Sequence, residues 1–430
     1  MSESPDPFCQ TDPGLQNQYD LVCIGFGPAS LAIAIALHDR GVKSRVLYIE
    51  KQRGFVWHGG MLLPNTRMQI SFLKDLATLR DPRSKFTFLN YLKTKNRLVP
   101  FTNLSTFLPL REEYNDYMSW CASHFEKHVK YGQEALGVTP FDSGTRPVQS
   151  WKVVSRNFET NERSAVTARN VVIAVGGKPR IPPALLAASG HDGRIVHSSQ
   201  YSTAIPRILT DRTKPYNVAV IGGGQSAAEI FIDLQSRHPD SSITLYTGAS
   251  TLKPSDDSPF VNEIFDPERV DTFYNFSIET RQKLIRNDKA TNYSVVRPEL
   301  LNLMYENMYH QRLREPDPRK WRQKIVSWRQ TIGYENCSDS RLFLKLQDTL
   351  TGEVSTSEAS FDLVILGTGY ERNGHETILE CTRHLLQEEN PYGVERNYRL
   401  KFRKDAVADE CGIWLQGCCE DSHGNELQEE

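Results

Sequence analysis

The chain has 430 residues, of which 39% are hydrophobic and 24% charged, proportions that are ordinary for a globular protein of two or three domains. The formal net charge is −2, which gives no basic field of the kind that attracts nucleic acid, so we expect no nucleic-acid partner. No apolar segment approaches the roughly 20 residues that a membrane helix needs, so we expect no membrane partner either.

The first residues and the cysteines bear on where the protein works. Residues 1–18, MSESPDPFCQTDPGLQNQ, are polar and lack the apolar core of a secretory signal, so we expect a disordered tail. The eight cysteines include no CxxC pair at zinc spacing, and the eleven histidines form no metal-spaced cluster. The sequence therefore predicts reduced thiols, no metal site and a cytoplasmic location.

The first predicted unit spans residues 19–51 and runs strand, glycine turn, helix, strand. Its turn reads GFGPAS, in which Gly25 permits a tight bend and Gly27, before Pro28, lets the backbone approach a pyrophosphate. Glu50 ends the second strand, where a carboxylate can accept hydrogen bonds from ribose hydroxyls. The glycine turn alone would also fit a simple tight turn, but with the helix, the second strand and the acid it predicts a dinucleotide site.

The segment after this unit carries candidate contacts for a cofactor and a substrate. Trp57 and His58 follow the Glu50 strand and would lie along the cofactor, although Trp57 fits a core position equally well. In MQISFLKDLATLRDP, residues 68–82, Lys74 interrupts an apolar run. A lysine is costly to bury without a partner, so Lys74 is either a solvated surface residue or one that faces a polar pocket.

A second unit repeats the same order over residues 216–248. Its turn reads GGGQSA, with Gly222 to Gly224 leaving the backbone bare and Gln225 and Ser226 adding polar groups near the phosphates. Two such units predict two dinucleotides, most economically FAD on the first and NAD(P)H on the second. The alternative is a duplicated fold in which one site is vestigial.

Two more strands and one long segment complete the predicted elements. Residues 170–182 and 361–370 each end in glycine, and both are expected to be buried parallel strands whose C-terminal ends meet a cofactor crevice. Residues 251–345 are rich in charged and aromatic residues, and we predict a mostly helical segment within or beside the second unit.

Three polar residues of these regions have both a functional and a structural interpretation. Asn262 in NEIFDP and Asn292 in NYSVV could hold an amino acid or a nicotinamide amide, because an amide both donates and accepts hydrogen bonds. Each also fits a helix cap or a turn. His197 in GRIVHSSQY is the histidine of most interest, with a satisfied structural residue as the alternative.

The order of several long motifs is more specific than any of these features. The motifs are GFGPASLA, WHGGMLLPNTRMQISFLKDLATLRDPRSKFTFLNYL, NLSTFLPLREEYNDYMSWCA, VIGGGQSAAEIF, PSDDSPFVNEIFDPERV, DKATNYSVV and GIWLQGC. From about residue 19 to about residue 424, the chain closely resembles the fungal L-ornithine N-hydroxylases, which are flavin-dependent N-hydroxylating monooxygenases of siderophore biosynthesis.

The resemblance implies a reaction. NADPH reduces FAD, oxygen adds to give a C4a-hydroperoxyflavin, and the side-chain amine of L-ornithine becomes a hydroxylamine, the first step of hydroxamate siderophore biosynthesis. It also implies L-ornithine and molecular oxygen as substrates and a homotetramer. Two alternatives stay open: the same architecture acting on L-lysine or another amine, and a diverged flavoprotein of low activity.

The resemblance also assigns roles to residues. Lys74 resembles the lysine that binds the substrate carboxylate, Asn262 the residue that holds the amino end, and Asn292 a catalytic residue that bridges substrate and NADP⁺. Beside Asn262, the substrate-binding stretch includes Glu263, Ile264 and Phe265. The residues expected to contact FAD are Gly25, Gly27, Pro28, Glu50, Lys51, Trp57, His58, Gln69 and Ala135. Those expected to contact NADP are Gly223, Gly224, Gln225, Ser226, Asn292, Tyr293 and Ser294.

The expected fold is α/β, with two Rossmann-like dinucleotide-binding domains and a small, mostly helical substrate region. We place the first part of the FAD-binding domain at residues 19–210. The NAD(P)H-binding domain and the helical substrate segments follow at residues 211–360. Residues 361–430 are expected to return to the FAD-binding domain.

The chain departs from the resemblance at two places. Gly248 stands where relatives carry an arginine suited to the 2′-phosphate of NADPH, so NADH is also a candidate cofactor. After Gly424 the sequence reads NELQEE, whereas relatives continue with a helix that contacts the flavin and the substrate. We therefore expect a shortened C-terminal segment, with either a weak FAD site or other segments filling the gap.

Overall fold

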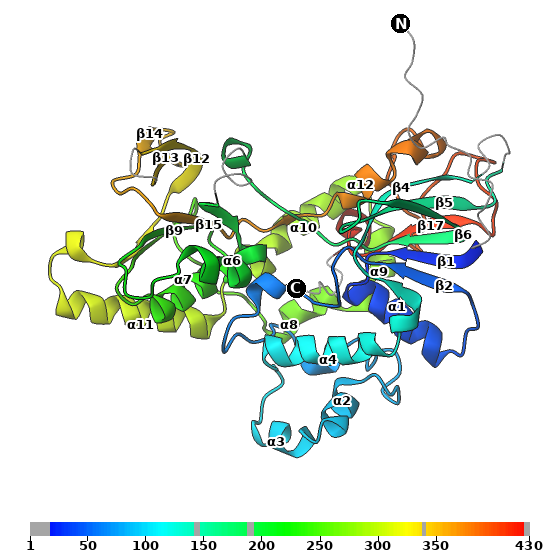
Figure 1. The fold of residues 1–430 in the computed structure, drawn as a ribbon, viewed down its shortest axis with the longest axis horizontal. Helices are drawn as coiled ribbons and strands as arrows, with labels where there is room; N and C mark the ends of the chain where they lie inside the picture. Colours follow the sequence, from blue (N-terminus) through cyan, green and yellow to red (C-terminus); the bar gives the residue numbers. More distant parts are fainter. Residues whose placement is uncertain (1–17, 142–146, 187–192, 338–340, 425–430) are drawn as a thin grey trace, which may run out of the picture.

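The computed structural model describes residues 18–141, 147–186, 193–337 and 341–424 of the chain. Two β-sheets with accompanying helices lie side by side (Figure 1). From here on, the first unit is the mixed sheet around strand β1 with its helices, and the second unit is the parallel sheet around strand β9 with its helices. In Figure 1 the first unit is on the right and the second on the left. The predicted α/β class is therefore found.

The sheet of the first unit has seven strands. Its hydrogen-bonded order is β3-β2-β1-β6-β5-β4, with β17 also pairing with β6. The strands are β1 (Gln18–Ile24), β2 (Val46–Ile49), β3 (Val129–Lys130), β4 (Gln133–Pro140), β5 (Trp151–Asn157), β6 (Arg163–Ile173) and β17 (Gly412–Leu415). β1 runs parallel to both β2 and β6, which places the C-terminal ends of three strands at one edge.

The two faces of this sheet pack into different hydrophobic clusters, because alternate side chains of a strand point to opposite faces. Val22 and Ile24 pack into one hydrophobic cluster, whereas Cys23 packs into a second cluster with helix α1 (Pro28–Asp39). The second cluster also takes side chains from α2 (Phe88–Thr94), α3 (Leu98–Asn103) and α4 (Arg111–Ser123), the cyan and blue helices low in Figure 1.

The sheet of the second unit has five parallel strands in the order β11-β10-β9-β15-β8. They are β8 (Ile195–His197), β9 (Asn217–Ile221), β10 (Ser242–Tyr246), β11 (Gln323–Val326) and β15 (Leu363–Leu366). Helices α6 (Tyr201–Ile208), α7 (Gln225–Arg237) and α11 (Pro298–Arg314) contribute to its core. An antiparallel sheet of β12 (Arg329–Asn336), β13 (Leu342–Asp348) and β14 (Val354–Thr356) adjoins it.

The domain boundaries predicted at 210/211 and 360/361 are wrong. β8 already pairs with β15, and β15 pairs with β9, so both strands belong to the second sheet. The chain rejoins the first sheet only at β17. Within the predicted stretches, the expectation of buried parallel strands is confirmed for Leu363–Leu366 and for the C-terminal part of β6. Both boundaries were misplaced because a short apolar strand carries no local signal of the sheet to which it belongs.

The two connections between the units pair with each other. The chain leaves the first unit through β7 (Lys178–Pro179) and returns through β16 (Tyr370–Glu371), and these two strands form an antiparallel pair. His197 supports the same junction: its Nε2 lies 3.0 Å from the carbonyl oxygen of Gly369 and its Nδ1 lies 3.0 Å from Oγ of Ser199. This buried histidine is therefore the satisfied structural residue that the sequence offered as an alternative.

The segment 251–345 is helical only in its first part. It forms α8 (Pro259–Asn262), α9 (Val270–Tyr274), α10 (Ile278–Asn292) and α11, but then β11, β12 and most of β13. The mostly helical prediction is wrong for residues 323–337 and 341–345, where alternation such as LFLKLQD places every second side chain in the core.

Two of the predictions concern the ends of the chain. Gln18 belongs to β1 and not to a tail. Residues 1–17 and 425–430 lie outside the described residues, so the disordered tail and the altered C-terminal segment stay predictions. Within the described part, no helix combines the length and apolar character needed to cross a membrane.

Candidate active site

The first glycine turn closes tightly against the strand beside it. Gly25 has φ +90°, and a Cβ there would lie 2.3 Å from the carbonyl oxygen of Ala174 at the end of β6, so only glycine fits. A Cβ at Gly27 would meet nothing within 4 Å, and no side chain caps helix α1, which begins at Pro28. The backbone at Gly27 is therefore open to a ligand, and the N–H groups at the start of the helix lack a side-chain cap, as binding of a pyrophosphate requires.

Glu50 braces this turn from inside the protein. Its two carboxylate oxygens accept hydrogen bonds from the backbone N–H groups of Phe26 at 2.7 Å and Gln52 at 2.8 Å. The buried carboxylate keeps further lone pairs that could accept from a ribose. Lys51 is exposed and pairs with Glu134 at 3.0 Å, next to the expected FAD contact Ala135 in β4.

Trp57 belongs to the core of the first unit, and His58 beside it contacts Tyr370 of the connection between the units. Trp57 is buried and its ring packs edge-on to His58 and Tyr114, so the core interpretation of this tryptophan holds. His58 is exposed in part, but its ring lies edge-on to those of Trp57 and Tyr370, which keep water from much of the imidazole. This desolvation, followed by the positive charges of Arg111 and Arg372, lowers the pKa of His58 to about 4, and the imidazole is neutral at pH 7.

Lys74 ends a single turn of 3-10 helix, Phe72–Lys74, and its side chain is half-buried. Among the described residues, its ammonium has no hydrogen-bond or ion-pair partner. The neighbouring carboxylate of Asp75 is occupied elsewhere: it accepts from the backbone N–H groups of Ala77, Thr78 and Phe88 at 2.6–2.9 Å and from the Thr78 hydroxyl at 2.8 Å. A half-buried cation without a partner is suited to binding an anionic ligand.

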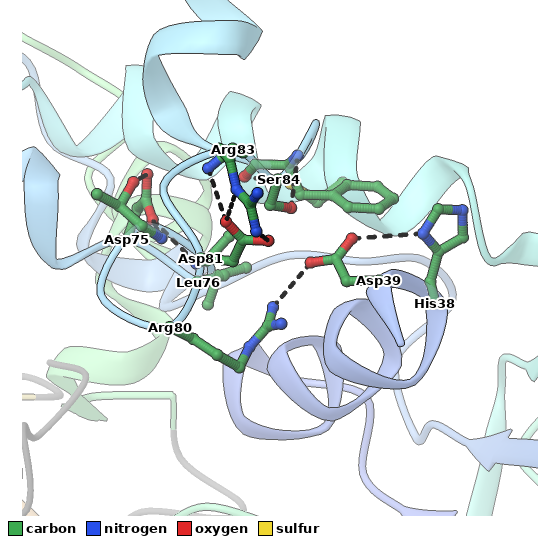
Figure 2. Close-up of polar contacts among 12 residues, drawn as sticks. His38, Asp39, Asp75, Leu76, Arg80, Asp81, Arg83 and Ser84 are labelled. Carbon is green, nitrogen blue, oxygen red and sulfur yellow. Dashed lines mark hydrogen bonds and ion pairs between the residues drawn. The ribbon is translucent and has the colours of Figure 1, made fainter. Parts of the chain in front are cut away.

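Asp75 also fixes the loop that follows Lys74. Figure 2 shows this loop returning to α1, where Arg80 donates to Asp39 at 3.0 Å, and Arg83 folding back on Asp81. Burial raises the pKa of the Asp75 carboxyl, and the four hydrogen bonds act in the opposite direction. The segment thus holds Lys74 in place through its neighbours and leaves the ammonium itself available.

We expect Asp75→Ala to lower the free energy of unfolding by about 3 kcal/mol, because one change removes the acceptor of four hydrogen bonds. Thr78→Val is the matched control, since it removes one of the four donors and should cost about 1 kcal/mol. Urea unfolding of both variants provides the measurement. Equal losses in the two variants would show that Asp75 does not organise this loop.

The second glycine turn resembles the first in its packing. Gly222 has φ +145°, and a Cβ there would lie 2.3 Å from the carbonyl oxygen of Gly367 at the end of β15. A Cβ at Gly223 would lie 2.7 Å from Oγ1 of Thr247, and one at Gly224 would lie 3.4 Å from Cα of Ser294. The structure therefore brings together Gly223, Gly224 and Ser294, three of the expected NADP contacts. As in the first unit, no side chain caps the following helix, α7, whose second residue is Ser226.

The side chain of Gln225 does not point to a phosphate site. Its Nε2 donates to Oε1 of Glu229 at 2.7 Å, and its Oε1 accepts from the backbone N–H of Arg297 at 2.9 Å. Arg297 in turn donates from Nη1 to the carbonyl oxygen of Met68 at 3.2 Å. These contacts place the second glycine turn next to the segment that carries Gln69, which is half-buried, and Lys74.

The segment that precedes Asn262 runs beside the segment that contains Asn292. The backbone of residues 253–256 runs beside that of residues 291–296, with Ser255 donating to Val296 and Val296 to Lys253, each at 2.9 Å. Asn262 ends α8, and its Nδ2 donates to the carbonyl oxygen of Asp257 at 2.7 Å, so its side chain also serves the turn before the helix.

The other predicted site residues of these two segments are Glu263 to Phe265, Asn292 and Tyr293. Glu263–Phe265 form a single 3-10 turn after Asn262, with Glu263 exposed and Ile264 and Phe265 half-buried. Asn292 is the last residue of α10, but its side chain lies outside the described part of the structure. The Tyr293 hydroxyl donates to the carboxylate of Glu420 at 3.0 Å, which ties this segment to helix α13 (Glu420–His423).

Gly248 stands at an open position after β10. It is exposed, and a Cβ there would make only an ordinary contact of 3.5 Å with Cγ2 of Thr349. We therefore expect Gly248→Arg to fold normally and to increase the preference for NADPH over NADH several-fold, because a guanidinium there can pair with a 2′-phosphate. Gly248→Gln controls for side-chain size. An NADPH/NADH ratio of kcat/KM unchanged in the arginine variant would show that the 2′-phosphate is bound elsewhere.

Sequence reasoning missed Arg111 and Glu229. Nη1 of Arg111, the first residue of α4, lies 2.7 Å from Oε2 of Glu229 in α7, and the exposed fractions of the two side chains are 11% and 4%. This buried ion pair joins the helices of the two units. Nothing in the sequence marks it, because the partners are 118 positions apart and each stands in an ordinary helical context.

The described residues contain no group of three or more His, Cys, Asp or Glu side chains that could hold a metal ion.

Comparison with known proteins identifies the family. Residues 17–372 match the family model for L-lysine 6-monooxygenase/L-ornithine 5-monooxygenase. An L-ornithine N(5)-monooxygenase of Ajellomyces capsulatus is 51% identical over 411 residues, which cover 95% of this chain and 86% of that protein. The ornithine hydroxylase PvdA from Pseudomonas aeruginosa has a TM-score of 0.86 at 40% identity, with 95% and 94% of the two chains covered.

A second solved structure adds the ligands of a relative. The ornithine N-hydroxylase KtzI of Kutzneria sp. 744, with reduced FAD, NADP⁺ and L-ornithine, has a TM-score of 0.85 at 33% identity and covers 96% of each chain. The family match spans most of the chain, including both glycine turns and the segment around Lys74. The chain belongs to the L-lysine 6-monooxygenase/L-ornithine 5-monooxygenase family.

Proposed function

We propose that the protein hydroxylates the side-chain amine of L-ornithine at N5, using FAD, NADPH and molecular oxygen, as the first step of hydroxamate siderophore biosynthesis. The observation that carries the substrate assignment is the half-buried ammonium of Lys74, which has no partner among the described residues and lies on a segment joined to the second glycine turn. The relatives that act on ornithine support the same assignment.

The two glycine turns suit the two dinucleotides. In this proposal the N–H groups after Gly27 hold the pyrophosphate of FAD, and those after Gly224 hold that of NADPH. FAD, when bound, activates oxygen with electrons that NADPH supplies. Glu50 supports the first turn and remains able to accept from a ribose, while the neutral His58 adds no positive charge beside the first cofactor.

The task of the chain's own residues is to orient the amino acid. Lys74 pairs with the substrate carboxylate, and Asn262 accepts a hydrogen bond from the α-ammonium group. The side-chain amine then projects away from Lys74. Because Lys74 recognises a carboxylate, a simple diamine lacks the group that this site binds. The role of Asn292 as a bridge between substrate and NADP⁺ is part of the proposal.

Purified protein tests the proposal directly. We expect a yellow protein, or one that becomes yellow when FAD is added, whose NADPH oxidation yields hydroxylated product with L-ornithine and far less with L-lysine or putrescine. Putrescine is informative because it has the ornithine side chain without the carboxylate. A colourless protein that fails to take up added FAD would contradict the proposal. Equal product from ornithine and putrescine would contradict the role of Lys74.

A further inference from the structure

A ring of hydrogen bonds connects the two units beside the second glycine turn. Arg111 of α4 pairs with Oε2 of Glu229 at 2.7 Å, and the other oxygen of Glu229 accepts from Gln225 at 2.7 Å. Gln225 accepts from the backbone of Arg297, whose guanidinium donates to the carbonyl oxygen of Met68 at 3.2 Å. The backbone N–H of Met68 donates to the carbonyl oxygen of Pro109 at 2.9 Å, two residues before Arg111, and this contact closes the ring.

Each member of the ring has a distinct place in the fold. Arg111 begins a helix of the first unit, and Gln225 is the first residue of the helix that follows the second glycine turn. Met68 lies in the segment that leads to Lys74, and Arg297 follows the segment that contains Tyr293 and Ser294. The ring therefore links the first unit, the second glycine turn and the substrate segment.

Glu229 supplies the buried carboxylate of this ring. Burial raises the pKa of its carboxyl, and Arg111, Gln225 and Arg297 oppose this shift. A buried ion pair of this kind contributes little to stability compared with an apolar pair of the same size, but loss of one partner leaves an uncompensated buried charge. What such a pair supplies is a fixed geometry, because both charged groups must meet at hydrogen-bond distance.

We propose that Arg111 and Glu229 are positioning residues that hold the second glycine turn in register with the substrate segment, so that bound NADP⁺ and L-ornithine meet at a fixed separation. The inference rests on the proposed function for its meaning, but its first consequence concerns only nucleotide binding. When the ring is broken, Gly222 to Gln225 lose their fixed relation to residues 68–74. NADP⁺ then binds more weakly, and oxygen chemistry is less well coupled to substrate.

Glu229→Gln is the main test, since it keeps the size of the side chain and removes its charge. We expect the Kd of FAD-loaded protein for NADP⁺ to rise 10-fold or more, with normal FAD content and a larger share of NADPH electrons appearing as hydrogen peroxide. In nucleotide-free protein, we expect faster hydrogen–deuterium exchange at residues 220–226. Asp240→Asn is the matched control, because it removes one negative charge from an exposed ion pair with Arg322 within the second unit.

A second variant keeps the test decisive if Glu229→Gln does not fold. Gln225→Ala keeps the Arg111–Glu229 pair and removes the two hydrogen bonds by which Gln225 joins Glu229 to Arg297. NADP⁺ affinity should again fall, while Asp240→Asn stays near the wild-type value. Unchanged NADP⁺ affinity in the folded variants, even with reduced thermal stability, would overturn the inference. Titration and exchange require no turnover, so they decide this point whether or not L-ornithine proves to be the substrate.

Discussion

Replacing Lys74 with alanine is expected to raise the KM for L-ornithine by 10-fold or more, while the rate of flavin reduction by NADPH stays nearly unchanged. A charge-assisted hydrogen bond to a carboxylate contributes ~1.5–3 kcal/mol, and a 10-fold change corresponds to about 1.4 kcal/mol. The effect should fall on the substrate because Lys74 has no partner among the described residues, so its removal breaks no contact seen within the protein.

The control for this variant is Lys93→Ala. Lys93 is an exposed lysine of α2, and its removal changes the net charge equally without touching the segment of Lys74. Steady-state kinetics with ornithine and stopped-flow reduction of the flavin separate the two steps. If Lys74→Ala and the wild type share the same ornithine KM, the carboxylate role of Lys74 is wrong.

Replacing Gly27 with alanine is expected to lower FAD content at least 10-fold while leaving the apoprotein folded. An added Cβ meets no protein atom within 4 Å, so the methyl group enters the space that we assign to the pyrophosphate. Gly25→Ala should behave differently. At φ +90° and 2.3 Å from the Ala174 carbonyl oxygen, the new Cβ strains the turn itself, and we expect the fold to be destabilised.

The second glycine turn supplies the cross-control. Gly224→Ala should weaken NADP⁺ binding and leave FAD content normal, because it alters only the turn of the second unit. Flavin absorbance, the thermal midpoint of the apoprotein and NADP⁺ titration distinguish these variants. Normal FAD content in Gly27→Ala, or loss of FAD in Gly224→Ala, would show that the cofactors are assigned to the wrong units.

The parts of the fold that follow from local sequence were predictable. The order strand, glycine turn, helix, strand at residues 19–51 and 216–248 appears in the structure because each piece depends on short-range periodicity and on backbone freedom at Gly25 and Gly222. Membership of a sheet was not predictable in the same way. The strand at residues 363–366 has the same buried pattern as its counterpart in β6, and only long-range topology assigns it to the second sheet.

In the candidate site too, local features were predictable from the sequence and long-range contacts were not. Lys74 could be singled out because a charge within an apolar run is a local anomaly, and the structure leaves its ammonium without a partner among the described residues. The ion pair of Arg111 with Glu229 could not be found, since it depends on contact between two units. Gln225 was predictable only in part. Its position at the turn was predicted, but its side chain forms hydrogen bonds with Glu229 and Arg297.

The measurement that tests the central claim most directly is the mass of the product formed from L-ornithine under ¹⁸O₂ with NADPH, with hydrogen peroxide measured in parallel. The proposed function predicts N5-hydroxyornithine that carries one ¹⁸O atom, in an amount close to the NADPH consumed. L-Lysine under the same conditions should give mainly peroxide. Consumption of NADPH that yields only hydrogen peroxide with L-ornithine, or more product from L-lysine, would contradict the assignment.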